Sequence, residues 1–173
     1  MIISRTPFRI SFFGGGTDYP VWFKEHGGAV LATTIDKYCY ITCRHLPPFF
    51  EHKTRLAYSR IEHVMSNAEI EHPAVRGVLQ YLHMTEGLEI HHDGDLPART
   101  GLGSSSSFTV GLLHALYAMQ HRMPTKSELA HAAIHVELVV VEHEPFDAIR
   151  LIERSYLGDH ASGGSHAHPS QRR

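Results

Sequence analysis

Residues 101–107 read Gly-Leu-Gly-Ser-Ser-Ser-Ser and stand between a segment of strand character and an apolar segment. Glycine lets the backbone approach a ligand closely, and the amides at a helix N-terminus, the positive end of its dipole, favour a bound phosphate. Apolar residues then repeat at helical spacing: Phe108, Leu112, Ala115 and Leu116. The stretch therefore predicts a strand, a phosphate-binding loop and a helix. Taken alone, it could also be a flexible turn followed by a serine N-cap.

The N-terminal segment alternates in character. Strand periodicity places two sets of residues on opposite faces: Arg5, Pro7, Arg9 and Ser11 on one, Phe8, Ile10 and Phe12 on the other. We therefore expect a strand with a cationic face and a core face. Three glycines follow at residues 14–16 and allow backbone conformations that other residues resist. Asp18 comes next, a carboxylate that can accept hydrogen bonds from sugar hydroxyls.

Together these segments resemble the GHMP kinases, the family of galactokinase, homoserine kinase, mevalonate kinase and phosphomevalonate kinase. The first motif of that family resembles residues 7–18, and its phosphate loop resembles residues 97–105. Residues 5–18 and 29–38 most resemble the branch of D-glycero-D-manno-heptose 7-phosphate kinases, with the fucose kinases nearby. The resemblance covers roughly residues 1 to 137. Two motifs at the expected separation are more specific than either one.

The resemblance implies an α+β fold, the N-terminal domain of the GHMP kinase fold, with a mixed sheet, packed helices and no C-terminal domain. Residues 1–142 would be the ATP-binding domain, and residues 143–173 a divergent, partly disordered tail. The implied reaction is ATP-dependent phosphorylation of a sugar or sugar phosphate, with Mg²⁺. The implied substrate is D-glycero-D-manno-heptose 7-phosphate, converted to the 1,7-bisphosphate, with fucose or another hexose as the alternative.

The resemblance also implies roles for individual residues. ATP would be bound by Pro97, Gly101, Leu102, Gly103, Ser104, Ser105 and Ser106. The substrate would be bound by Arg5, Gly15, Gly16, Thr17 and Asp18. Arg9 would act in catalysis as an electrostatic clamp on the transferring phosphoryl group. Ser105 and Glu137 would be the magnesium ligands, because hard oxygen donors suit that ion.

Glu137 has a position that suits this role. It lies at the edge of an apolar helical stripe formed by Leu129, Ala132, Ala133, Val136 and Val140. We therefore expect its carboxylate to point inward, which costs little near a metal or a cationic phosphate site but much if the charge is unpaired. The alternative is an ordinary carboxylate on the flank of a helix.

The resemblance ends after Glu137. The family has an aspartate-bearing loop further along, which acts as base or orients the acceptor hydroxyl. Residues 138–150 contain no Gly-Ser-Gln-Asp pattern, and Asp147 is flanked by Pro145 and Phe146, so the role is not transferred. The second half of the family fold is also missing. A disrupted reading frame or an engineered fragment would explain this. Residues 158–173 have no apolar period and are expected to be disordered.

Two functions from different classes follow. One is a truncated sugar kinase, which we expect to show no turnover above background. The other is a non-catalytic remnant that binds nucleotide weakly or not at all. A serine hydrolase is disfavoured, because the Gly-Ser-Ser-Ser segment at residues 103–106 lacks the glycine that a nucleophile elbow needs two residues after its serine.

Composition narrows the class of partner. The 173 residues are 42% apolar and 20% charged, an ordinary balance for a globular domain. A net charge of −2 argues against nucleic acid, which would require an excess of lysine and arginine. No leader pattern and no run of ~18 apolar residues is present, so we expect a cytoplasmic protein that binds no membrane. An incomplete domain should expose apolar surface and self-associate.

The remaining pattern gives the expected elements. We expect strands at about 2–12, 54–60 and 88–91, a strand hairpin at 28–47 with its bend near Asp36 and Lys37, and helices at 19–26, from Pro73 and from Thr125. Cys39 and Cys43 share a strand face ~13 Å apart, too far for a disulfide, so both should be reduced core residues. His131 and His135 fall on the solvated side of a helix, where a surface position is favoured over a zinc site.

Overall fold

The structure is a computed structural model that describes residues 1–17, 20–98 and 100–140. Its elements, in chain order, are β1 (Ile2–Phe13), α1 (Pro20–His26), β2 (Leu31–His45), β3 (Thr54–Ala57), β4 (Ile61–Val64), η1 (Asn67–Glu69), α2 (Pro73–Tyr81), β5 (Leu88–Gly94), α3 (Ser104–Met119) and α4 (Lys126–Val140). No helix in these ranges is long and apolar enough to cross a membrane.

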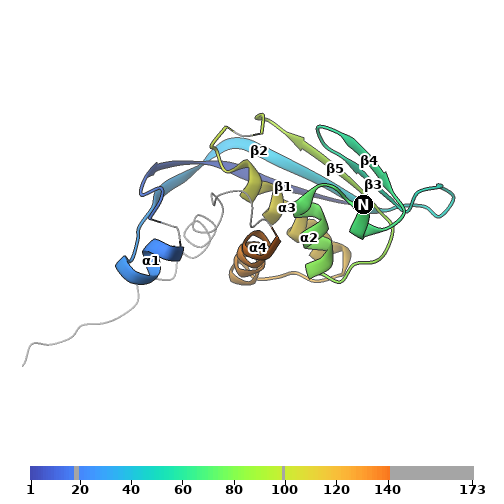
Figure 1. Cartoon of the computed structure of the whole chain (residues 1–173). Helices are drawn as coiled ribbons and strands as arrows, with labels where there is room; N and C mark the ends of the chain where they lie inside the picture. Colours follow the sequence, from blue (N-terminus) through green and yellow to red (C-terminus); the bar gives the residue numbers. More distant parts are fainter. Residues whose placement is uncertain (18–19, 99, 141–173) are drawn as a thin grey trace, which may run out of the picture.

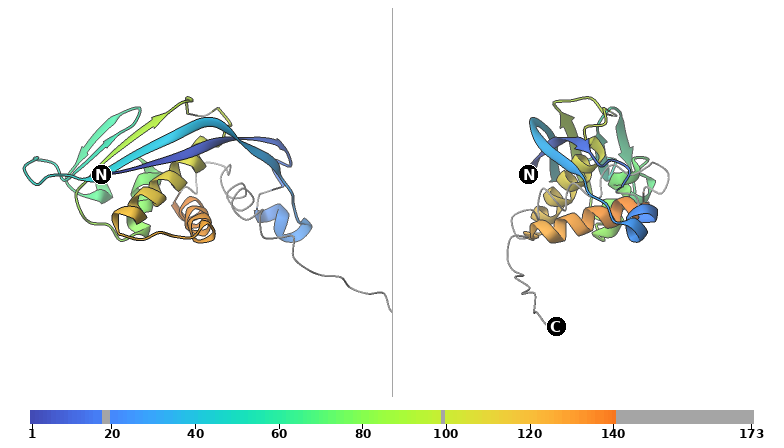
Figure 2. Two further views of the ribbon diagram at one scale, coloured as in Figure 1. Left: turned by 180° about the vertical axis from the view of Figure 1, so that it is seen from behind. Right: turned by 90° about the vertical axis from the view of Figure 1, so that its left-hand side faces the viewer.

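The described strands form one mixed sheet in the order β1-β2-β5-β3-β4, in which only β3 and β5 pair in parallel. Helices α2, α3 and α4 lie together against one face of this sheet, the covered face (Figure 1). The opposite face carries no described helix in any of the three views and is called the open face (Figure 2). The expected α+β class, a mixed sheet with packed helices, is confirmed.

The core lies between the covered face and the helices. From the sheet it takes Cys39, Ile41 and Cys43 of β2 and Leu88 and Ile90 of β5, all fully buried. From the helices it takes Val75 and Val78 of α2, Leu112 and Leu116 of α3, and the α4 stripe of Leu129, Ala132, Ala133 and Val136. Both cysteines are free thiols in this core, as expected, and burial raises the pKa of each to about 12.

The expected hairpin at 28–47 is wrong. β2 is one continuous strand of 15 residues, and Asp36 and Lys37 lie inside it. Instead, the pairing of β1 with β2 changes register at these two residues. Pro7 of β1 pairs with Tyr38, whereas Arg9 pairs with Thr34. Between these two pairs β2 has more residues than β1, and they form an irregularity in the β1-β2 ladder. The strand does not reverse direction there. The strand expected at 54–60 ends at Ala57, and β4 follows it as a second, unexpected strand.

Arg5 and Arg9 have different surroundings. Arg5 lies opposite Tyr40 and its guanidinium stacks over the Tyr38 ring at 3.7 Å, on the open face. Arg9 is only 8% exposed and packs against Gly103 at the start of α3. The predicted common face for the two arginines is therefore wrong, because Arg5 stacks on Tyr38 whereas Arg9 lies against the start of α3.

The far ends of β1 and β2 extend past the helical layer and carry α1 (Figure 1). Phe12 was expected in the core, but it is 57% exposed, and Phe13, Trp22 and Leu31 beside it are exposed as well. The helices α2, α3 and α4, which cover the sheet elsewhere, do not reach this end of the strands in the left view of Figure 2. Self-association through such apolar surface stays a prediction.

Candidate phosphate-binding site

The glycines of residues 101–107 shape the entry to α3. Gly101 and Gly103 have φ of 72° and 73°, left-handed values that favour glycine. Gly103 is the N-cap residue, and no side chain caps the helix, so the alternative of a serine N-cap is wrong. The first backbone amides of α3 therefore point out of its N-terminus, as a phosphate site requires.

The serines of this segment divide into two kinds. The Ser106 hydroxyl donates to the Gly103 carbonyl at 3.1 Å, and the Ser107 hydroxyl donates to the Pro7 carbonyl of β1 at 3.0 Å. Both residues are buried. Ser104 is half-buried and Ser105 is exposed. Only the second pair therefore has hydroxyls that reach the surface around the helix N-terminus.

Arg9 joins the first motif to this loop. Its backbone N–H donates to the Leu102 carbonyl at 3.1 Å. Its side chain crosses Gly103 so closely that a Cβ atom on that glycine would lie 2.7 Å from Arg9 Cγ and 2.8 Å from Nε. Glycine at position 103 thus serves two needs, a left-handed backbone and room for an arginine. The structure brings together two motifs that lie far apart in the sequence.

The glycine turn of the first motif lies further along β1. Gly14 has a φ of 89°, and a Cβ there would lie 1.9 Å from the Ala29 carbonyl oxygen, so this position requires glycine. The Thr17 hydroxyl donates to the Gly14 carbonyl at 2.8 Å and so holds the turn. Gly15 and Gly16 are exposed, and Asp18 lies outside the described residues. Strand rise puts this turn roughly 16 Å from Arg9.

The predicted magnesium ligands lie on two helices that pack together, Ser105 on α3 and Glu137 on α4. Glu137 Oε1 is shielded from solvent, which agrees with the expected inward position. Within the described ranges, no three His, Cys, Asp or Glu side chains group as a metal cage. This donor set fits Mg²⁺, which commonly takes one or two protein oxygens and completes its shell with substrate phosphates and water. Pro97 lies exposed before the loop, and Arg99 is outside the described residues.

Comparison with known proteins places this geometry in a family. Residues 62–152, more than half of the 173, match the GHMP kinases N terminal domain. The chain belongs to the GHMP kinases. It is 24% identical over 145 residues to the D-glycero-alpha-D-manno-heptose 7-phosphate kinase of Campylobacter jejuni, in a match that covers 79% of this chain and 43% of that protein.

Solved structures show the same fold for this GHMP kinase chain. A D-glycero-D-manno-heptose 1-phosphate kinase from Bacteroides thetaiotaomicron superposes with a TM-score of 0.73 at 23% identity, over 84% of this chain and 50% of that one. The galactokinase of Lactococcus lactis, crystallised with galactose, gives a TM-score of 0.64 at 19% identity, over 88% of this chain and 40% of the other. The chain spans about half the length of the relatives it matches.

An aromatic group beside the phosphate loop of this GHMP kinase was not anticipated. The His72 ring stacks on Phe108 at 4.9 Å, and the His92 ring meets Phe108 edge-on at 5.0 Å. Burial lowers the pKa of both histidines and so favours the uncharged form of both rings. The rings come from three separate segments, and no local pattern in the sequence connects them.

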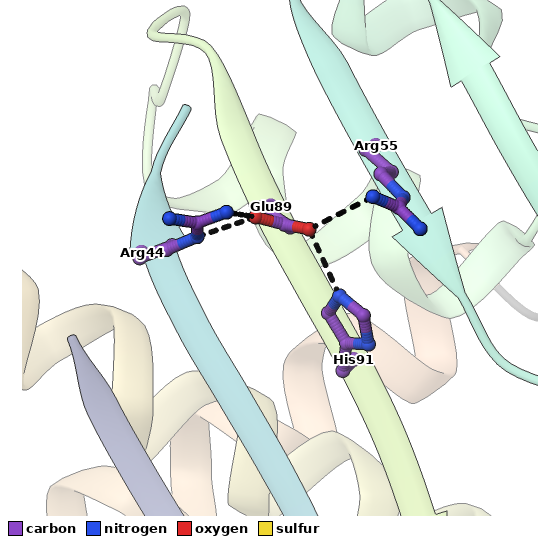
Figure 3. A network of polar contacts seen from close by, with 4 residues as sticks. All are labelled: Arg44, Arg55, Glu89 and His91. Carbon is purple, nitrogen blue, oxygen red and sulfur yellow. Dashed lines mark hydrogen bonds and ion pairs between the residues drawn. The ribbon is translucent and has the colours of Figure 1, made fainter. Parts of the chain in front are cut away.

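A charged cluster on the open face was also missed. Glu89 of β5 accepts hydrogen bonds from Arg44 of β2, and its Oε1 lies 3.4 Å from Arg55 of β3 and 3.0 Å from His91 (Figure 3). Glu89 is only 4% exposed although it lies on the open face, because these long side chains cover it. Its neighbour Ile90 points the other way, into the core. This network therefore lies across the sheet from the phosphate loop.

Proposed function

We propose that this GHMP kinase chain binds MgATP through the entry to α3, as the nucleotide-binding half of a kinase that phosphorylates a sugar or sugar phosphate. The observation that carries the proposal is the contact between Arg9 and Gly103. It places a buried arginine at the positive end of a helix, where two sources of positive charge meet. A bound polyphosphate would stabilise both the arginine charge and the positive end of the helix dipole.

Each part of this site has a distinct chemical task. Backbone amides of Gly103, Ser104 and Ser105 would bind phosphate oxygens, with Gly101 and Leu102 shaping the turn. Arg9 would hold the transferring phosphoryl group, whose negative charge spreads over its oxygens during transfer. The Ser105 hydroxyl and the Glu137 carboxylate would hold Mg²⁺ against those phosphates. The ion supplies charge neutralisation and fixes the orientation of the phosphates.

For the substrate we propose a heptose 7-phosphate, with fucose or another hexose as the alternative. Two relatives support a heptose phosphate, since their names describe a heptose 7-phosphate kinase and a heptose 1-phosphate kinase. The galactokinase match supports the alternative. The turn containing Gly15, Gly16, Thr17 and Asp18 is the proposed sugar site. Arg5 stays a predicted phosphate contact, although its stacking on Tyr38 directs it to the open face.

We further propose that the chain as given binds MgATP without catalysing transfer. Residues 138–150 lack the family's aspartate pattern, and loss of a positioned base costs about 10² to 10⁴ in rate. The alternative is a remnant that binds no nucleotide. Such a remnant would also show no turnover, so only a measurement of MgATP binding distinguishes the two.

Two measurements on the whole chain test this function. Titration calorimetry with ATP should show binding that requires Mg²⁺, and a coupled assay for ADP with D-glycero-D-manno-heptose 7-phosphate should show no turnover above background. An absence of MgATP binding would establish the remnant instead. Turnover at about 1 to 100 s⁻¹, ordinary for kinases, would show that Asp147 or another residue supplies the base.

A further inference from the structure

We propose that Ser107 is a positioning residue, which holds the part of β1 that carries Arg9 against the phosphate loop. This inference rests on the proposed function, in which Arg9 contacts the transferring phosphoryl group. Ser107 itself is 5% exposed and stands a full helical turn behind the N-terminus of α3. It would therefore act through Arg9 and not by touching a ligand.

Two hydrogen bonds tie β1 to α3 and to the loop before it, on either side of one buried residue. The Ser107 hydroxyl donates to the Pro7 carbonyl at 3.0 Å, and the Arg9 N–H donates to the Leu102 carbonyl at 3.1 Å. Phe8 lies between the two tethers and is 1% exposed. The backbone that leads into Arg9 is thus fixed at two points, by the phosphate loop and by α3.

These tethers matter because the sheet does not fix this position well. The β1-β2 ladder changes register between Pro7 and Arg9, so regular strand pairing is interrupted where the arginine emerges. Pro7 also has no N–H to contribute to a ladder. Besides its pairing with Thr34 of β2, the position of Arg9 therefore depends on the bonds from the helix side.

The hydroxyl of Ser107 is used differently from that of its neighbour. Serine in a helix commonly donates back to a carbonyl of its own helix, and Ser106 does so toward Gly103. Ser107 instead donates across to another element, 100 residues away in the sequence. Without it, the Pro7 carbonyl would lose its tether and the stem of Arg9 could leave Gly103.

The first test measures the tether without any ligand. Amide hydrogen exchange, followed by NMR on the full chain, should be on the order of tenfold faster at Arg9 in Ser107→Ala, with β5 amides unchanged. Thr109→Val is the matched control, because Thr109 is fully buried in the same helix and its hydroxyl has no hydrogen-bond partner among the described residues. Unchanged exchange at Arg9, or equal acceleration throughout the sheet, would overturn the proposal.

The second test separates positioning from general stability. Ser107→Ala should weaken MgATP binding about two- to tenfold, and the same change made in an Arg9→Gln background should have no further effect. An equal loss in both backgrounds would show that Ser107 acts independently of Arg9 and would refute the positioning role. If the parent chain binds no MgATP, the proposed function fails, while the exchange experiment still decides the tether.

Discussion

Among the described residues, two charged side chains are buried, Glu89 and Arg9, and the protein holds them in different ways. On the open face, Glu89 is surrounded by Arg44 and Arg55 of the two neighbouring strands and by His91 of its own strand (Figure 3). On the covered face, Arg9 is fixed through its backbone bond to Leu102 and by its stem across Gly103.

We propose that the charge of Glu89 stabilises the fold and that the charge of Arg9 is placed for a ligand. The charge of Glu89 is compensated within the protein, which is the condition for burying a carboxylate at little cost. The charge of Arg9 stands at a helix N-terminus, where the dipole disfavours a cation and favours an anion. Changes on the two faces should therefore have separable effects on binding and on stability.

The largest expected effect is on binding, from Gly103→Val. Its side chain would occupy the space of the Arg9 stem, and valine would be forced into a left-handed backbone. We expect MgATP affinity to fall by on the order of 100-fold or more, measured by calorimetry.

Gly27→Val is the matched control for that change. Gly27 also has a positive φ, of 70°, but a Cβ there meets nothing within 4 Å. Both variants should lose about 1–3 kcal/mol of stability from backbone strain, while only Gly103→Val loses binding. Equal binding by Gly103→Val and the parent chain would remove residues 101–105 from the site.

The next effect is on stability, from Glu89→Gln. Loss of the carboxylate leaves Arg44 and Arg55 close together without their shared counterion, and we expect a loss of about 1–3 kcal/mol in urea denaturation. Glu86→Gln is the control, because Glu86 pairs with His45 at 3.3 Å while both side chains are well exposed, and it should cost under about 0.5 kcal/mol. Similar losses of stability in the two variants would show that the open-face network contributes no more than an exposed ion pair.

A smaller effect is the pH dependence of the same network. Burial raises the pKa of Glu89, but hydrogen bonds and charges from His91 and Arg44 outweigh it, so the folded pKa lies below the ordinary value of 4.5. A depressed carboxylate pKa stabilises the fold above the unfolded value and loses that contribution as pH falls through the folded one. The stability difference between parent and Glu89→Gln should thus shrink as pH falls below about 5. A difference that grows on acidification would contradict this sign.

Local features of the fold were predictable from the sequence. The helix expected from Thr125 forms and begins with a capping box, in which the Thr125 N–H donates to Glu128 at 2.8 Å and the Glu128 N–H donates to Thr125 at 3.2 Å. The helix from Pro73 is also confirmed, and so is the apolar stripe of α4 over Leu129, Ala132, Ala133 and Val136. Each depends on residues within a turn or two of one another, where spacing determines geometry.

Features that depend on strand register were not predictable. The position of Arg9 against Gly103 depends on how β1 meets the entry to α3, which no periodicity in either segment reveals. The Glu89 network requires the order β2-β5-β3, which joins strands that are distant in the chain. Three consecutive glycines likewise did not show that Gly14 is the one pressed against Ala29.

The central claim is that Arg9 is placed for a phosphate ligand and Glu89 for the fold. MgATP affinity measured by calorimetry in Arg9→Gln and Glu89→Gln, beside the parent chain, tests it most directly. We expect Arg9→Gln to weaken binding about 10- to 100-fold, the value of a charge-assisted hydrogen bond, and Glu89→Gln to leave it within about twofold. Equal losses in both variants, or unchanged affinity in Arg9→Gln, would contradict the account.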